Sequence, residues 1–154
     1  MAQFAPKTVH WDAAGMLEGL DRAALATSSK ALEELEPFFW FDLCAEHDAI
    51  NLHHHLQRSG VTFSADFWRF EDAWYRDEMN HFRGFDRLYR RFYPHRVADM
   101  APRLERREPQ FGPLEPFLED ELRLLVLFAY DELATSQAYY RDLVLYESFG
   151  EPVL

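Results

Sequence analysis

The feature that most constrains this sequence is a set of polar residues on the apolar faces of its longest predicted helices. Residues 64 to 93 read as one helix, because Ser64 is a suitable N-cap and Pro94 follows the segment. Steps of three and four residues trace the apolar face of this helix. They pass through Phe67, Glu71, Trp74, Glu78, His81, Phe85, Leu88 and Phe92. Two carboxylates and an imidazole therefore lie on a face that we expect to be buried.

Two further predicted helices show the same conflict. A helix over residues 37 to 59 carries Glu46 on the same face as Phe39, Leu43 and Ile50. A last helix, from about residue 114 to 149, carries Glu132 within an apolar stretch. Each of the three helices thus points a carboxylate inward near the middle of its length.

Buried carboxylates must be protonated, paired with basic groups or bound to a cation, because an unpaired buried charge is costly. Lys and Arg are scarce on these apolar faces. Glu78 and His81 are three residues apart, so both can hold the same ion from one side of a helix. Oxygen and imidazole ligands without thiolate suit iron or manganese, with zinc as a substitute. The sequence therefore predicts a metal site formed by Glu46, Glu78, His81 and Glu132.

Composition narrows the class of protein. The 154 residues fit a single domain, 1–154, and a hydrophobic content of 48% favours a globular fold. A net charge of -11 argues against nucleic acid or an anionic membrane as partner. Cys44 is the only cysteine, so no disulfide framework is expected. With no signal-peptide pattern and no apolar run of membrane-spanning length, we expect a cytoplasmic protein.

The breaks along the chain predict an all-α helical bundle. Residues 12 to 36 indicate one helix or two short ones, and a short turn at Gly60 makes the next two helices antiparallel. Residues 94 to 113 hold four prolines and little periodicity. We interpret them as a long crossover, which would make the helices on either side of it parallel.

With these features, the sequence resembles the ferritin-like di-iron carboxylate superfamily, whose helices carry Glu, Glu-x-x-His, Glu and Glu-x-x-His in order. Glu46, then Glu78 with His81, then Glu132 match the first three elements. The run from Trp74 to His81 is similar to a motif of the soluble acyl-carrier-protein desaturases. The run Glu132-Leu-Ala-Thr135 is similar to a second motif of the same desaturases. The same segments resemble the arylamine N-oxygenases less closely.

The resemblance implies a ferritin-like bundle with a long crossover between its second and third core helices, holding two iron ions. It implies an oxidoreductase that uses dioxygen to oxidise a C–H or N–H bond of a small-molecule or carrier-bound organic substrate, with an external electron donor. Thr135 would assist oxygen chemistry, and Trp74 would lie on a route for electrons. The fourth core helix, with its second Glu-x-x-His, is missing from the sequence, so we expect a homodimer that covers the exposed face or a longer native chain.

Other interpretations remain open. A ferroxidase or iron-storage subunit would need no organic substrate, and a metal-free interaction module would have the fold without the chemistry. Within His53-His54-His55 only His53 shares the face of Glu46, which gives it a minor case for a role at the metal. Glu71 and Glu121 lie near helix ends, where we expect them to be solvated.

Overall fold

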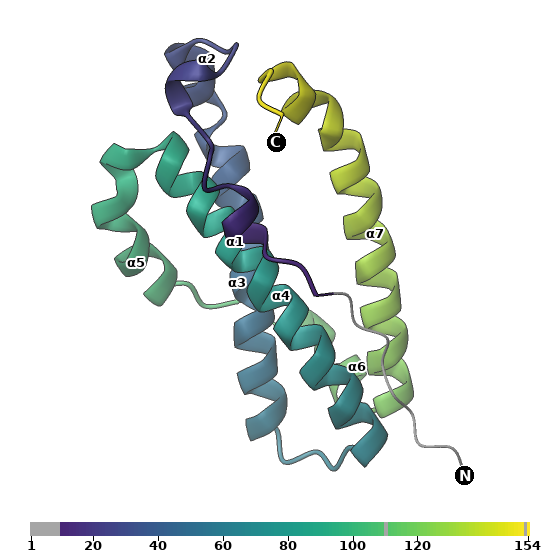
Figure 1. Ribbon diagram of the computed structural model, residues 1–154. Coiled ribbons are helices and arrows are strands. Elements are labelled where there is room, and N and C mark those ends of the chain that lie inside the picture. The colour runs from purple at the N-terminus through teal and green to yellow at the C-terminus, as the bar shows by residue number, and fades with distance from the viewer. Residues whose placement is uncertain (1–9, 110, 153) are drawn as a thin grey trace.

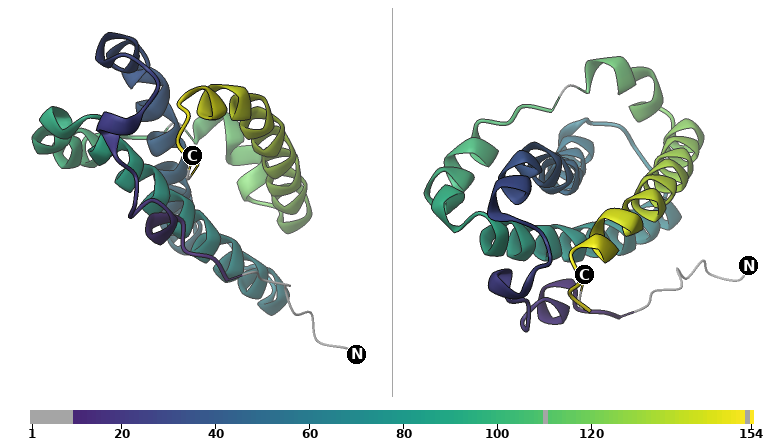
Figure 2. Two further views of the ribbon diagram at one scale, coloured as in Figure 1. Left: turned by 45° about the horizontal axis from the view of Figure 1, so that its top comes forward. Right: turned by 90° about the horizontal axis from the view of Figure 1, so that it is seen from above.

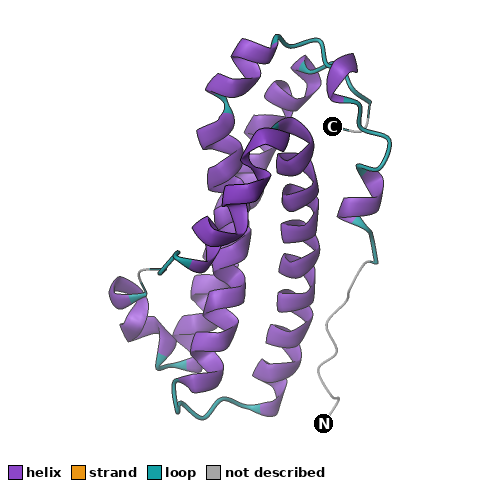
Figure 3. Ribbon diagram, turned by 90° about the vertical axis from the view of Figure 1, so that its left-hand side faces the viewer, coloured by secondary structure: helices purple, strands orange, loops and turns teal. Residues whose placement is uncertain are grey.

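The computed structural model describes residues 10–109, 111–152 and 154, and within them every regular element is helical (Figure 3). This confirms the predicted all-α class. The α-helices are α1 (Ala13–Met16), α2 (Ser29–Glu34), α3 (Glu36–Arg58), α4 (Ala65–Phe92), α5 (Val97–Glu105), α6 (Glu115–Leu118) and α7 (Glu121–Ser148). Short 3₁₀ turns are η1 (Arg22–Ala24), η2 (Pro94–Arg96) and η3 (Gly112–Leu114).

Helices α3 and α4 form the predicted antiparallel pair. Gly60 has a φ of 74°, a conformation that glycine adopts without steric cost, and it follows Ser59, the C-cap of α3. Ser64 caps α4, with its hydroxyl accepting a hydrogen bond from the Phe67 N–H at 3.0 Å. The boundaries of both helices agree with the predicted ones to within a residue.

The connection after α4 is more ordered than its prolines suggest. It contains α5, a helix that the sequence analysis did not predict, with Met100 and Leu104 buried beneath it. Arg107, just after α5, ties the connection to α3, because its Nε donates a hydrogen bond to Asp48 Oδ1 at 2.7 Å. The stretch still works as a crossover, because α7 runs in the same direction as α4 and opposite to α3 (Figure 1).

The last predicted helix is two helices. It breaks after α6, where Asp120 adopts an extended conformation and caps α7 by accepting a hydrogen bond from the Arg123 N–H at 2.8 Å. The N-terminal region, predicted as one helix or two short ones, forms α1, η1 and α2. Helices α5 and α7 lie on opposite sides of the α3–α4 pair (Figures 1 and 2).

The core consists of two apolar clusters with a polar zone between them. One cluster gathers the ends of α3, α4 and α7 near α2, and includes Phe39, Leu88, Phe92 and Phe149. The other lies at the opposite end of the three long helices: Leu56, Phe63, Phe67, Leu118, Leu124 and Phe128. The middle of α3, α4 and α7 belongs to neither cluster, and Glu46, Glu78 and His81 lie there.

Helix α7 is apolar on two opposite faces. Its inner face buries Leu124 and Phe128 and half-buries Tyr139 and Tyr146. The opposite face, called here the outer stripe, carries large apolar side chains that are 60–73% exposed: Leu122, Val126, Tyr130, Leu133, Tyr140 and Val144. A helix that is apolar on both sides is typically enclosed between partners. In the described part of the chain, no helix is both long and apolar enough to cross a membrane.

Candidate metal centre

Three side chains meet between α3 and α4. Glu46 of α3 and Glu78 and His81 of α4 each offer one ligand atom, and these three atoms lie within 4.8 Å of one another. His81 Nδ1 is 3.5 Å from Glu46 Oε2 and 3.7 Å from Glu78 Oε2. The helical spacing of three residues puts Glu78 and His81 on one face of α4, and the antiparallel pairing brings Glu46 opposite them.

The charges of this cluster are strongly coupled. Burial raises the pKa of Glu78 to about 8, with a further contribution from the Glu46 carboxylate. Burial alone would lower the pKa of His81, but the Glu46 and Glu78 carboxylates raise it to about 10. Burial likewise opposes ionisation of Glu46, yet the neighbouring His81, Glu78 and Tyr139 side chains lower its pKa. Without an ion, the cluster at neutral pH therefore holds one carboxylate, one carboxylic acid and an imidazolium.

Helix α7 contributes Tyr139 to this centre. The Tyr139 hydroxyl donates a hydrogen bond to Glu46 Oε1. Burial, followed by the charge of Glu46, raises the pKa of Tyr139 far above its usual range, so the phenol keeps its proton. No motif in the sequence indicated this role, although Tyr139 lies on the inner face of α7.

Further carboxylates lie close to Glu46. Asp42, one turn before Glu46 in α3, is buried, and burial, then the charges of Asp142 and Glu46, raise its pKa to about 7. Burial and the charge of Glu46 also raise the pKa of Asp131 in α7. The spacing of four residues between Asp42 and Glu46 was the sequence signal for the first of these.

The donor set fits a single hard cation. Glu46 is 4% exposed, and its Oε2 atom has no hydrogen-bond partner among the described residues. A buried carboxylate oxygen without a partner is costly, and a cation between Glu46, Glu78 and His81 would satisfy it. Two carboxylates and one imidazole would leave coordination positions for water or another ligand.

Glu132, Trp74 and Thr135 lie outside the group of three ligands. Glu132 does not point inward as expected: it is exposed, and its Oε1 accepts a hydrogen bond from Trp74 Nε1 at 2.7 Å. The Trp74 ring also packs edge-to-face against Phe128, with ring centroids 4.5 Å apart. Thr135 is half-buried, one turn before Tyr139. Glu132 and Trp74 therefore bond to each other and tie α7 to α4.

The expectation that Glu71 is solvated is wrong. Glu71 is 1% exposed, and its Oε1 lies 2.6 Å from His53 Nδ1. His53 also stacks on Tyr75 with ring centroids 4.0 Å apart. Glu121 is half-buried and accepts hydrogen bonds from the Ser64 N–H and hydroxyl. Glu71 therefore joins α4 to α3, and Glu121 joins α7 to the N-cap of α4.

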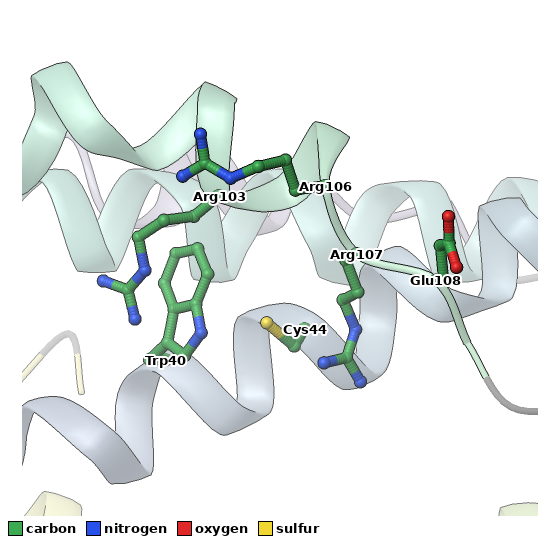
Figure 4. Close-up of a pocket in the computed structure, with 6 residues that line it drawn as sticks. All are labelled: Trp40, Cys44, Arg103, Arg106, Arg107 and Glu108. Carbon is green, nitrogen blue, oxygen red and sulfur yellow. The ribbon is translucent and has the colours of Figure 1, made fainter.

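An apolar pocket of about 380 Å³ adjoins the centre. His81 and Tyr139 belong to its lining, together with side chains of the N-terminal segment, α4 and α7. A second pocket, of about 340 Å³, lies over Cys44 on the other side of α3 (Figure 4). Its Arg103 and Arg107 are already paired with Glu36 and Asp48, so we assign no ligand to it.

Comparisons with protein-family models, with curated proteins and with solved structures give no match for this chain.

Proposed function

We propose that this protein is a non-haem iron oxidoreductase that uses dioxygen to oxidise a C–H or N–H bond of an organic substrate. The observation that carries the proposal is the buried cluster of Glu46, Glu78 and His81 with an apolar pocket directly beside it. A ferroxidase site has no need of such a pocket, so the pocket favours an organic substrate.

The residues around the centre have separable roles in this proposal. Glu46, Glu78 and His81 hold the ion, which supplies the capacity to activate dioxygen. Tyr139 fixes the orientation of the Glu46 carboxylate through Oε1, which leaves Oε2 directed at the ion. Trp11 packs near His81, with ring centroids 5.3 Å apart, and restricts the movement of the imidazole on that side. Thr135, by its resemblance to the desaturase motif, is the proposed proton donor on α7.

The overall reaction needs dioxygen and an external electron donor. A substrate R–H becomes R–OH with one oxygen atom, and the other leaves as water after two electrons from the donor and two protons are consumed. The same balance applies to oxidation at nitrogen. The net charge of -11 leaves the identity of the donor open.

The number of irons is the second part of the proposal. Three ligands serve one ion, whereas the resemblance implies two. A second iron would take Glu132 as a ligand once that carboxylate releases Trp74 Nε1. Trp74→Phe removes the competing donor, so it should tighten binding of the second ion and leave the first unchanged.

The test measures dioxygen consumption by the iron-loaded protein with ascorbate as reductant and naphthalene as an apolar test substrate. We expect uptake that depends on naphthalene, with a hydroxylated product detected by mass spectrometry. His81→Gln should abolish both, while His54→Gln, a change at an exposed histidine, should preserve them. Uptake that follows added Fe²⁺ alone would support a ferroxidase instead, and failure to bind iron would refute both.

We also propose that two copies of the chain associate through the outer stripe of α7. The stripe is symmetric about Leu133: Leu122 and Val144 lie eleven residues to either side, and Val126 and Tyr140 lie seven. An antiparallel pair with its twofold axis at Leu133 would match Leu122 with Val144, Val126 with Tyr140 and Leu133 with its own copy, as an isologous interface requires. The stripe contains no charged residue.

The available surface is close to what a dimer needs. Six side chains exposing on the order of 100 Å² each would bury roughly 600 Å² per copy, against about 800 Å² in a standard interface. Leu133→Arg would place two like charges at the twofold axis and should give monomers in analytical ultracentrifugation. Val97→Arg, a change on the distant helix α5, is the control. A wild-type monomer at tens of micromolar would contradict this proposal.

A further inference from the structure

We infer that the apolar pocket beside His81 binds an uncharged, largely apolar small molecule, held between α4, α7 and an N-terminal strap. The strap is defined here as residues 11–17. The inference rests on the proposed function, because it names the class of substrate for the same centre.

The strap is held on α4 next to the metal ligands. Trp11 Nε1 donates to Asp77 Oδ1 at 3.1 Å, and the Ala13 N–H donates to Asn80 Oδ1 at 3.2 Å. Gly84 permits the close approach, since a Cβ at that position would lie 2.8 Å from the Cβ of Ala13. These contacts come from three successive turns of α4, on either side of His81. The strap is therefore a fixed wall of the pocket.

The chemistry of the lining selects against charge. Trp11, Leu17, Phe85, Leu88, Leu143 and Tyr146 supply much of the wall, and none of the lining residues is Asp, Glu, Lys or Arg. Charged residues make up 28% of the whole chain, so a lining without any of them is markedly more apolar than the chain as a whole. An anion would find no Lys or Arg in the lining, and the positive charge of His81 or of a bound ion is balanced by the adjoining Glu46 and Glu78 carboxyl groups. A cation would likewise find no Asp or Glu in the lining to pair with.

The position of the polar groups orients the ligand. His81 and Tyr139 are the lining residues that also contact the carboxylates of the centre, through the Glu46 side chain. A ligand that fills the apolar part therefore presents one end to the metal. The volume of about 380 Å³ lies near the lower end for small-molecule sites. At about 30 Å³ per non-hydrogen group it accommodates roughly a dozen of them, as in one or two fused rings or a short alkyl chain.

The test compares two probes of equal size that share a naphthalene ring and match the pocket volume. 1-Naphthamide is neutral, whereas 1-naphthoate carries one negative charge. Binding to the full chain is measured by equilibrium dialysis, so that added tryptophans do not affect the readout. We expect saturable binding of one neutral probe per chain and at least tenfold weaker binding of the naphthoate. Equal affinities for the two probes would overturn the inference.

Two matched variants locate the binding. Leu143→Trp puts a larger side chain at the pocket and should weaken binding of the neutral probe at least tenfold. Phe41→Trp also introduces a tryptophan, but at a residue of α3 that is 68% exposed and lies outside both the lining and the outer stripe. It should leave binding unchanged. Equal effects of the two variants would mean that the probe does not bind in this pocket, and would overturn the inference. Circular dichroism melting of both variants checks that each is folded.

Metal binding separates this inference from the proposed function. Co²⁺ binding is measured in parallel by its visible absorption. A protein that binds Co²⁺ but shows no preference for the neutral probe would refute the pocket assignment and leave the metal centre standing. A protein that binds the neutral probe at the pocket but no metal would refute the proposed function and support the pocket.

Discussion

Replacing Gly84 with alanine tests the placement of the strap. In an ordinary helix interior, Gly→Ala stabilises a protein by roughly 1 kcal/mol, because glycine loses more backbone entropy on folding. At Gly84 the new methyl carbon would lie 2.8 Å from Ala13 Cβ, closer than such atoms approach. Relief requires the strap to move away from α4.

The size of the effect follows from what the strap would lose. Crowding in a packed interior costs typically 1–3 kcal/mol, and the hydrogen bonds of Trp11 and the Ala13 N–H contribute about 1 kcal/mol each. Set against the gain in helix propensity, Gly84→Ala should destabilise the protein by roughly 1–2 kcal/mol. Urea denaturation of the wild type and the variant measures this difference through the transition midpoint.

A second change and a control make the prediction specific. Ala13→Gly removes the opposing methyl group, so the double variant should recover at least about 1 kcal/mol relative to the sum of the single changes. Gly19→Ala introduces a methyl group into open space and should change stability by less than about 0.5 kcal/mol. If Gly84→Ala stabilises the protein and does not couple to Ala13→Gly, the strap does not pack against α4 as described.

Three further predictions concern the polar groups between the helices. The pKa values of about 8 for Glu78 and about 10 for His81 keep both protonated at pH 7, so binding of one Zn²⁺ should release close to two protons at pH 7 and about one at pH 9; calorimetry in buffers of different ionisation enthalpy counts them, and no release at pH 7 would contradict the described charges. His53→Ala leaves the Glu71 carboxyl buried without its partner and should cost roughly 1–3 kcal/mol in urea denaturation, whereas His54→Ala at the exposed neighbour should cost little; equal costs would refute the pairing. Thr135→Val should leave Co²⁺ binding intact but slow substrate-dependent oxygen uptake, and unchanged uptake would reduce Thr135 to a packing residue.

Local signals in the sequence were sufficient for the two long helices of the hairpin. Gly60, Ser64 and Pro94 mark their ends by fixed rules of backbone conformation and capping. The apolar face of α4 then placed Glu78 and His81 inward without reference to any other helix. The same reasoning placed Glu46 on the inner side of α3, because α3 also has an apolar face.

Other features depend on contacts between distant segments. Helix α5 was missed because Pro102 and several arginines obscure its short apolar pattern, and its stability comes from packing Met100 and Leu104. The burial of Glu71 follows from His53 on α3, which no pattern within α4 reveals. On α7 the apolar pattern runs around most of the helix, so it could not determine which of Asp131 and Glu132 lies nearer Glu46. The strap was beyond prediction because Gly84 and Ala13 are far apart in the sequence.

The most direct test of the central claim is an anaerobic titration of the metal-free protein with Fe²⁺, with bound iron measured by equilibrium dialysis. The wild type and His53→Gln, which alters a histidine outside the centre, should each bind at least one iron per chain. His81→Gln and Glu46→Gln should each weaken that binding at least a hundredfold while remaining folded by circular dichroism. Equal iron binding by all four proteins would contradict the assignment of Glu46, Glu78 and His81 as the metal centre.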